Sequence, residues 1–216
     1  MIRRPGRHRT PLRPSLRTAD LRLWERLLAG VVAFVVAAVP VALLLVLIEA
    51  NWPPLQWLDA GTAGHLHASV RDRPGVLAVL RVLSDGVWDP LTMRLLIAAT
   101  VGWLLWRRAW RLAVWAAATV TASGLTGLAV KVTVARARPA LPDPVAHAPG
   151  FSFPSGHAMT AATCWAVLLM VFTPVLGRRW LPAARTAAVI SVLGVGCTRL
   201  ALGVHWVCDV LGGWVL

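Results

Sequence analysis

The chain has 216 residues, of which 57% are hydrophobic and 14% are charged, and its formal net charge is +13. So apolar a composition excludes an ordinary soluble domain and favours a single polytopic membrane domain. The positive charge does not indicate nucleic acid. Eight arginines lie within the first 26 residues, and most of the others form short clusters between apolar runs. Such clusters are typical of topology signals, so we expect no nucleic-acid partner.

The N-terminal segment, residues 1–26, is expected to be a basic, disordered arm on the cytoplasmic side. It either contacts anionic lipid headgroups or remains a solvated tail. The apolar stretch Leu27–Ile48 follows, and it is longer than a signal-peptide core, so we expect a retained membrane anchor. It begins the membrane-embedded domain, residues 27–216. Residues 49–90 mix Trp, Pro, His and both signs of charge, which predicts an external amphipathic connection.

The rest of the chain alternates apolar runs with short polar connections, which predicts an all-α, polytopic helical bundle of about six transmembrane helices. The sixth, beginning near His205, has only 12 residues before Leu216. At 1.5 Å per residue it would rise only ~18 Å, so the supplied chain is expected to be truncated. The intermediate spans are expected at about Leu91–Trp106, Leu112–Val130, His157–Phe172 and Ala187–Leu202.

The arginine clusters predict an orientation. Placing the N-terminal arm and the turns at Arg107 and Arg178 on the cytoplasmic side satisfies the positive-inside rule. The other polar stretches then face the opposite side, where we expect the functional site of an integral protein of a bacterial plasma membrane.

Three polar constellations interrupt the apolar chain. The first contains Lys131, the single lysine, and Arg138-Pro139. A separation of seven residues is two helical turns, so both cations are expected on one helix face, with Pro139 ending the helix. Arg136 lies off that face and is expected to be a surface charge.

The second constellation is Pro154-Ser155-Gly156-His157, directly before an apolar run. Ser155 is a plausible helix N-cap, and Gly156 permits close approach to the backbone, so the free N–H groups could bind an anion. An ordinary cap with an incidental histidine is the alternative.

The third constellation is Thr198-Arg199, His205 and Asp209. His205 and Asp209 are four residues apart, so on a helix the carboxylate could orient the imidazole. A purely structural pair is the alternative. We expect surface positions for His65 and His67, and buried apolar environments for the three cysteines, Cys164, Cys197 and Cys208.

Energetics favour an anionic ligand for this set. An ionised side chain in hydrocarbon costs about 2.5–3.5 kcal/mol on insertion scales. Clustering Lys131, Arg138, Arg199 and Asp209 would offset part of that cost but leave excess positive charge. Fixed cations, a backbone anion site, two histidines and a carboxylate suit phosphoryl transfer without a metal.

Together, Lys131-x6-Arg138-Pro139, Pro154-Ser155-Gly156-His157 and Thr198-Arg199-x5-His205-x3-Asp209 resemble the three-part signature of the type 2 phosphatidic acid phosphatase family. The resemblance extends from about Leu91 to the chain end. Thr198 departs from it, because the family usually has Ser there, although the hydroxyl is kept.

The resemblance implies that Lys131, Arg138 and Arg199 clamp the phosphoryl oxygens with help from Ser155 and Gly156. It further implies that His205, oriented by Asp209, is the nucleophile, and that His157 protonates the leaving oxygen. No cofactor or metal is implied.

These roles predict a lipid phosphatase acting on a lipid phosphate or diphosphate, preferably undecaprenyl diphosphate. Phosphatidylglycerophosphate or phosphatidate is the alternative substrate. Transfer of phosphate to an alcohol, and a non-enzymatic anion-binding membrane scaffold, are alternative functions. Headgroup preference and oligomeric state leave no readable pattern in the sequence.

Overall fold

The computed structural model describes residues 28, 32, 35, 36 and 38–216. The predicted cytoplasmic arm, residues 1–26, lies outside the described residues, as does part of the first predicted span. The chain divides into Met1–Val39 and Pro40–Leu216, and the helical bundle lies within the second unit.

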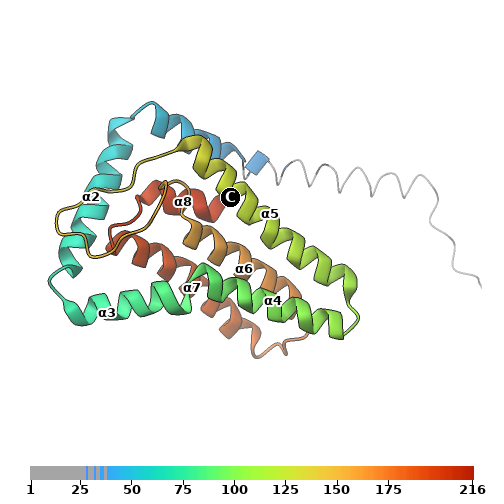
Figure 1. The fold of residues 1–216 in the computed structure, drawn as a ribbon. Helices are drawn as coiled ribbons and strands as arrows, with labels where there is room; N and C mark the ends of the chain where they lie inside the picture. Colours follow the sequence, from blue (N-terminus) through green and yellow to red (C-terminus); the bar gives the residue numbers. More distant parts are fainter. Residues whose placement is uncertain (1–27, 29–31, 33–34, 37) are drawn as a thin grey trace, which may run out of the picture. The chain divides into compact units, whose positions relative to one another are not determined.

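The described residues form helices and no strands, which confirms the all-α prediction (Figure 1). A helix ending at Glu49 is followed at a bend of 92° by α2. The subsequent elements are α2 (Pro53–Val70), α3 (Pro74–Val82), the π-helical turn η1 (Leu83–Val87), α4 (Pro90–Trp106), α5 (Trp110–Val134), α6 (Gly156–Phe172), α7 (Leu181–Ala201) and α8 (Val207–Val215).

Helix α6 is the centre of the bundle, and it packs against α4, α5, α7 and α8. Its small residues Ala158, Ala161 and Cys164 are fully buried, which lets the neighbouring helices approach closely. Gly213 of α8 shows how close: a Cβ there would lie 2.7 Å from the Ser155 carbonyl oxygen at the start of α6. The N-terminal end of α6 is therefore held in place by backbone contact.

Helices α5 and α7 have the length and apolar composition needed to cross a membrane, and the bent pair Ala38–Glu49 and Pro53–Val70 passes the same test jointly. Helix α6 is apolar but has 17 residues, a rise of ~25 Å. The total of about six spans stays a prediction. Apolar side chains point outward from the long helices, as a lipid-facing surface requires: Leu91, Leu95, Val114, Leu125, Val189 and Ile190 are all exposed.

The segment predicted to be an amphipathic connection forms α2 and α3. Helix α2 buries Leu55, Asp59, Ala63 and His67, which recur every four residues and form one stripe. It packs against α7 and α8. Because His67 is 3% exposed and its Nε2 donates to the Pro142 carbonyl oxygen at 3.0 Å, the predicted surface position of His67 is wrong.

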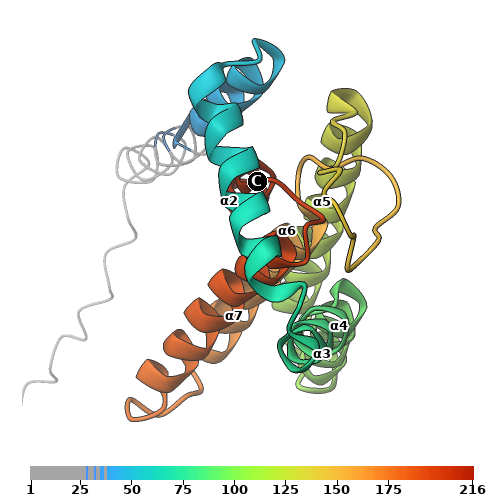
Figure 2. The same cartoon turned by 90° about the vertical axis from the view of Figure 1, so that its left-hand side faces the viewer.

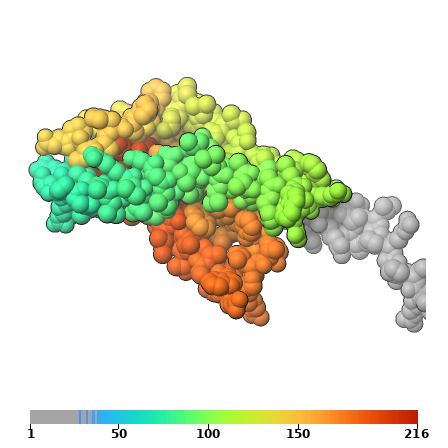
Figure 3. Space-filling model, turned by 60° about the horizontal axis from the view of Figure 1, so that its bottom comes forward, coloured from blue at the N-terminus to red at the C-terminus, as the bar shows by residue number. Residues whose placement is uncertain are grey.

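The chain direction brings several helix termini to one end of the bundle. The C-terminal ends of α5 and α7 meet the N-terminal ends of α6 and α8, and α2 runs across this end (Figure 2). Figure 3 shows the band of α3 and α4, with the connection after α5 above it and α7 projecting below. The three polar constellations all lie at these termini.

Candidate active site

Helix α5 ends earlier than the sequence suggested. It stops at Val134, and Ala135 adopts a left-handed conformation with φ 47°. Arg138 therefore lies in the connection that follows, so the prediction of a shared helix face with Lys131, ended by Pro139, is wrong. The two cations nevertheless converge: Lys131 Nζ and Arg138 Nη2 donate to the Phe151 carbonyl oxygen at 3.0 and 3.1 Å.

Arg138 is held firmly by its neighbours. Its Nε donates to the Gly150 carbonyl oxygen at 2.9 Å, and Nη1 donates to the Val204 carbonyl oxygen at 2.7 Å. Nη2 donates to the carbonyl oxygens of Pro149 and Phe151. The remaining Nη1 donor faces His205 Nε2 at 3.1 Å. All five N–H groups of the guanidinium thus have acceptors, so a phosphoryl group binding Arg138 would have to replace main-chain oxygens.

The contacts of His205 define its tautomer. Arginine can only donate, so His205 Nε2 must accept the bond from Arg138. Nδ1 then carries the proton and donates to Asp209 Oδ2 at 3.3 Å. His205 precedes α8 rather than lying on it, so the pair does not occupy one helix face as predicted. The Nε2 lone pair is directed at the cationic side of the site.

Burial and two guanidiniums lower the pKa of His205. Burial is the largest cause, and Arg138 and Arg199 add to it, while Asp209 opposes it; the pKa is about 4. The ring is therefore neutral at physiological pH, which is the form a nitrogen nucleophile requires.

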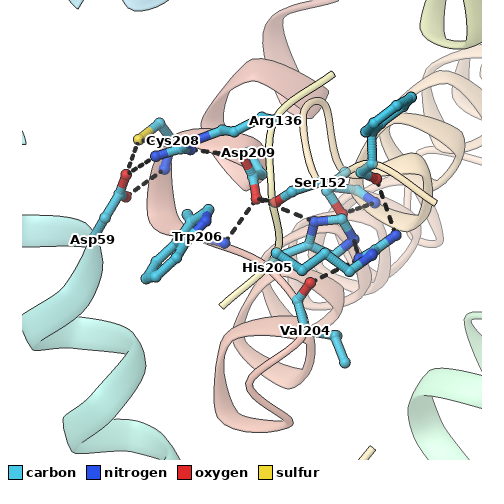
Figure 4. Close-up of polar contacts among 12 residues, drawn as sticks. Asp59, Arg136, Ser152, Val204, His205, Trp206, Cys208 and Asp209 are labelled. Carbon is cyan, nitrogen blue, oxygen red and sulfur yellow. Dashed lines mark hydrogen bonds and ion pairs between the residues drawn. The ribbon is translucent and has the colours of Figure 1, made fainter. Parts of the chain in front are cut away.

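Asp209 is fully buried in the first turn of α8. Its Oδ2 accepts from the backbone N–H of Trp206 at 2.8 Å and from the Ser152 hydroxyl (Figure 4). Its backbone carbonyl accepts from the N–H of Ser155 at 2.8 Å. Asp209 thus connects the start of α8 with the segment before α6.

Arg136 is part of this network, and the prediction of a surface charge is wrong. Its Nη1 donates to Asp209 Oδ1 at 2.8 Å, and its Nη2 donates to Asp59 Oδ2 at 2.7 Å. Asp59 is 2% exposed. Burial would lower the pKa of Arg136, but the two carboxylates outweigh it and raise the pKa above its ordinary value. Neither Arg136 nor Asp59 belongs to the three polar constellations.

The second constellation begins α6 as predicted. Ser155 is the N-cap, and its Oγ accepts from the Ala158 N–H at 3.5 Å. A Cβ on Gly156 would meet no atom within 4 Å, so the backbone is open here. A cavity of about 180 Å³ lies at this point, and its lining includes Lys131, Pro154 and Gly156.

His157 follows directly, in the first turn of α6. Its Nε2 is buried and makes no hydrogen bond within the described part of the chain. The nearest carboxylate oxygen is Asp89 Oδ2, at 3.9 Å. Asp89 was not among the predicted site residues, and it also caps α4 through Leu91 N at 2.7 Å.

Arg199 lies at the C-terminal end of α7 and is 5% exposed. Its Nη1 donates to the Ser84 hydroxyl at 2.8 Å and lies 3.5 Å from Asp85 Oδ1. Gly203, with φ 70°, turns the chain from α7 toward His205. Arg199 therefore approaches the site from the end of α7, held beside η1, and it is close enough to act on His205 electrostatically.

The prediction of a buried apolar environment is confirmed for Cys164, which lies in the apolar core, whereas Cys208 is buried but has polar neighbours. Cys164 and Cys208 are buried, and Cys208 donates its thiol proton to Asp59. Cys197 is exposed on α7, so the prediction of a buried environment is wrong for it.

Comparison with known proteins extends this description. Residues 112–216 match the model of the PAP2 superfamily. The chain is 43% identical over 90 residues to phosphatidylglycerophosphatase B of Bacillus subtilis, a match that covers 40% of this chain and 43% of that protein. It is 35% identical over 152 residues to decaprenylphosphoryl-5-phosphoribose phosphatase of Mycolicibacterium smegmatis, covering 68% of this chain and 77% of that one.

The fold also matches a solved structure. The crystal structure of a transmembrane PAP2 type phosphatidylglycerolphosphate phosphatase from Bacillus subtilis superposes with a TM-score of 0.74, at 24% identity, over 84% of this chain and 88% of that one. The residues that match the superfamily model include all three polar constellations. The chain therefore belongs to the PAP2 superfamily.

Proposed function

We propose that the protein is an integral-membrane lipid phosphatase that passes the phosphoryl group of a lipid phosphate or diphosphate to His205 and then to water. The observation that carries this proposal is the state of His205. Its Nδ1 proton is bound by a buried carboxylate, and its Nε2 lone pair faces a guanidinium at 3.1 Å. An oriented, neutral imidazole beside fixed cations is suited to attack on phosphorus.

In the first step, the hydrogen bond from Arg138 Nη1 to His205 Nε2 breaks as that N–H turns to a phosphoryl oxygen. His205 Nε2 then forms a bond to phosphorus, and the bond from phosphorus to the lipid oxygen breaks. His157, whose Nε2 is buried beside Asp89, supplies the proton to that oxygen. In the second step, water gives a proton to His157 and attacks phosphorus, and the N–P bond breaks to free phosphate.

The cations stabilise the charge that develops on the phosphoryl oxygens. The Phe151 carbonyl oxygen marks where Lys131 and Arg138 converge, and a phosphoryl oxygen would replace it there. Arg199 contributes from the C-terminal end of α7, and the open backbone at Gly156 offers N–H groups at the start of α6. These roles need no metal.

Within this class, a polyprenyl-linked phosphate such as undecaprenyl diphosphate is the preferred substrate. The match to this chain covers 77% of the Mycolicibacterium relative, and the name of that relative contains a decaprenyl group, which is a polyprenyl chain. Phosphatidylglycerophosphate is the second candidate, because the 43% identity over 90 residues is to a phosphatase named for it. We further propose a bacterial plasma membrane, because both of these relatives are bacterial, and a site on its non-cytoplasmic face, because of the arginine clusters.

The test is phosphate release by the purified protein in detergent and in vesicles, with undecaprenyl diphosphate, phosphatidylglycerophosphate and phosphatidate compared, each with and without EDTA. Release from at least one lipid, fastest from undecaprenyl diphosphate and unchanged by EDTA, is expected. If no phosphate is released from any lipid, the proposed phosphatase activity is wrong. If EDTA abolishes phosphate release and Mg²⁺ restores it, the metal-free mechanism is wrong. Phosphate found on an added alcohol would instead identify a phosphotransferase.

The pH dependence of His205 gives a separate prediction. Its pKa is about 4 in the folded protein, against an ordinary value of about 6.5. Because the folded pKa is depressed, the stability associated with neutral His205 is present above pH ~6.5 and is lost as pH falls towards 4. The imidazole shift of His205 in NMR spectra, assigned with a His205→Gln variant, should titrate near pH 4. A midpoint at or above 6.5 would contradict the buried, neutral ring.

A further inference from the structure

We infer that Asp59 and Arg136 are positioning residues, which hold the Asp209 carboxylate in place and balance the charge that His205 acquires when it attacks phosphorus. This inference rests on the proposed function, which it deepens. It assigns to α2 the role of positioning the catalytic groups. Helix α2 lies outside residues 112–216, which match the superfamily model.

The first argument is geometric. Asp209 uses its Oδ2 for His205, Trp206 and Ser152, whereas its Oδ1 accepts from Arg136 at 2.8 Å. The Arg136 bond therefore fixes the rotation of the carboxylate about its Cβ–Cγ axis. With that rotation fixed, Oδ2 stays directed at His205 Nδ1, as Figure 4 shows.

Arg136 is itself fixed by Asp59. The two side chains pair at 2.7 Å, with exposed side-chain fractions of 16% and 3%. Asp59 also accepts from the Cys208 N–H at 3.0 Å and from its thiol. Asp59 therefore connects α2 both to Arg136 and to the first turn of α8, one residue before Asp209. Arg136 additionally lies over the Trp206 ring at 5.6 Å.

The second argument concerns charge. With Asp59 and Asp209 ionised and Arg136 protonated, the three groups carry a net charge of −1, and neutral His205 leaves it unchanged. When Nε2 forms a bond to phosphorus, the imidazole ring becomes positive, because Nδ1 keeps its proton and continues to donate it to the ionised Asp209 carboxylate. The net charge of the four groups is then zero. In a poorly solvated site this compensation lowers the energy of the attacking state.

Without the charge of Asp59, this compensation is lost. Arg136 and Asp209 would cancel one another, and the positive ring would have no balancing charge within the network. The missing charge acts on the chemical step rather than on phosphoryl binding, because Lys131, Arg138 and Arg199 do not bond to Asp59. A positioning role therefore predicts a change in kcat with little change in KM.

The experiment compares three α2-region variants with wild type and with His205→Ala in the phosphate-release assay, per mole of folded protein measured by size-exclusion chromatography. Asp59→Asn keeps the shape of the side chain and removes its charge. Asp59→Glu keeps the charge. Asp72→Asn is the matched control. Asp72 lies just beyond α2 and its side chain is 80% exposed, so this substitution removes the same charge from the surface.

We expect Asp59→Asn to lower kcat by about tenfold with KM changed less than about twofold. Asp59→Glu should recover most of that loss, and Asp72→Asn should match wild type. If Asp59→Asn lowers the yield of folded protein but leaves kcat unchanged, Asp59 is merely structural and the inference fails. If Asp59→Asn has the kcat of wild type while His205→Ala is inactive, the inference fails and the proposed function stands. If the wild-type protein is inactive, both the proposed function and the inference fail.

Discussion

Replacement of His205 with alanine is expected to reduce lipid-phosphate release by at least about a thousandfold. The imidazole supplies the nitrogen that attacks phosphorus, and the side chains around it are positioned to assist that nitrogen rather than to replace it. Arg138 can only donate hydrogen bonds, and Asp209 is engaged by the Trp206 N–H and the Ser152 hydroxyl. The measurement is initial phosphate release from the best lipid substrate of wild type.

His65→Ala is the matched control, since His65 is an exposed histidine on α2, and it should retain wild-type turnover. His205 is 2% exposed, so the folded state of His205→Ala must be verified by its elution volume and circular dichroism. A folded His205→Ala protein that releases phosphate at more than about a tenth of the wild-type rate would remove His205 as the nucleophile.

The helices and the grouping of the constellations could be predicted because both depend on local patterns. Apolar runs of sufficient length indicate helices in a membrane, and alternating chain direction places the end of α5 beside the start of α6. Ser155 was predicted as an N-cap from its position directly before an apolar run, and it is one. For these features, neighbouring residues carry the information.

The contacts of Arg136 with Asp59 and Asp209 could not be predicted from local sequence patterns. The helical spacing suggested that Lys131 and Arg138 share a face, but Ala135 is left-handed with φ 47° and ends α5 before Arg138. That single backbone change turns Arg136 toward the interior. Its partner Asp59 is 77 residues away in the chain, and such a pairing leaves no periodic trace.

The buried position of His67 on α2 was missed for a related reason. The buried stripe of this helix places Asp59 and His67 beside Leu55 and Ala63. Two ionisable residues in a four-residue repeat resemble a solvated face, because a charge is seldom buried unless it is paired. The pairing groups, Arg136 for Asp59 and the Pro142 carbonyl for His67, lie in the connection after α5. Only the tertiary structure reveals them.

The same network gives the largest expected effect on stability. Arg136→Met should destabilise the folded bundle by about 3–5 kcal/mol, because it leaves two buried carboxylates without their shared counter-charge. Asp59 and Asp209 are 2% and 0% exposed, and both bond to Arg136 at 2.7–2.8 Å. Methionine preserves much of the apolar stem, so the loss reports mainly the charge. The measurement is unfolding in detergent followed by circular dichroism.

Arg178→Met is the control, because Arg178 is an exposed arginine in the turn before α7, and removing a solvated charge should change stability little. A double variant, Arg136→Met with Asp59→Asn, removes one carboxylate charge as well and should recover part of the loss. If Arg136→Met is as stable as Arg178→Met, the two carboxylates do not require Arg136. Recovery in the double variant, by contrast, would show that the cost comes from uncompensated negative charge and not from the shape of the missing side chain.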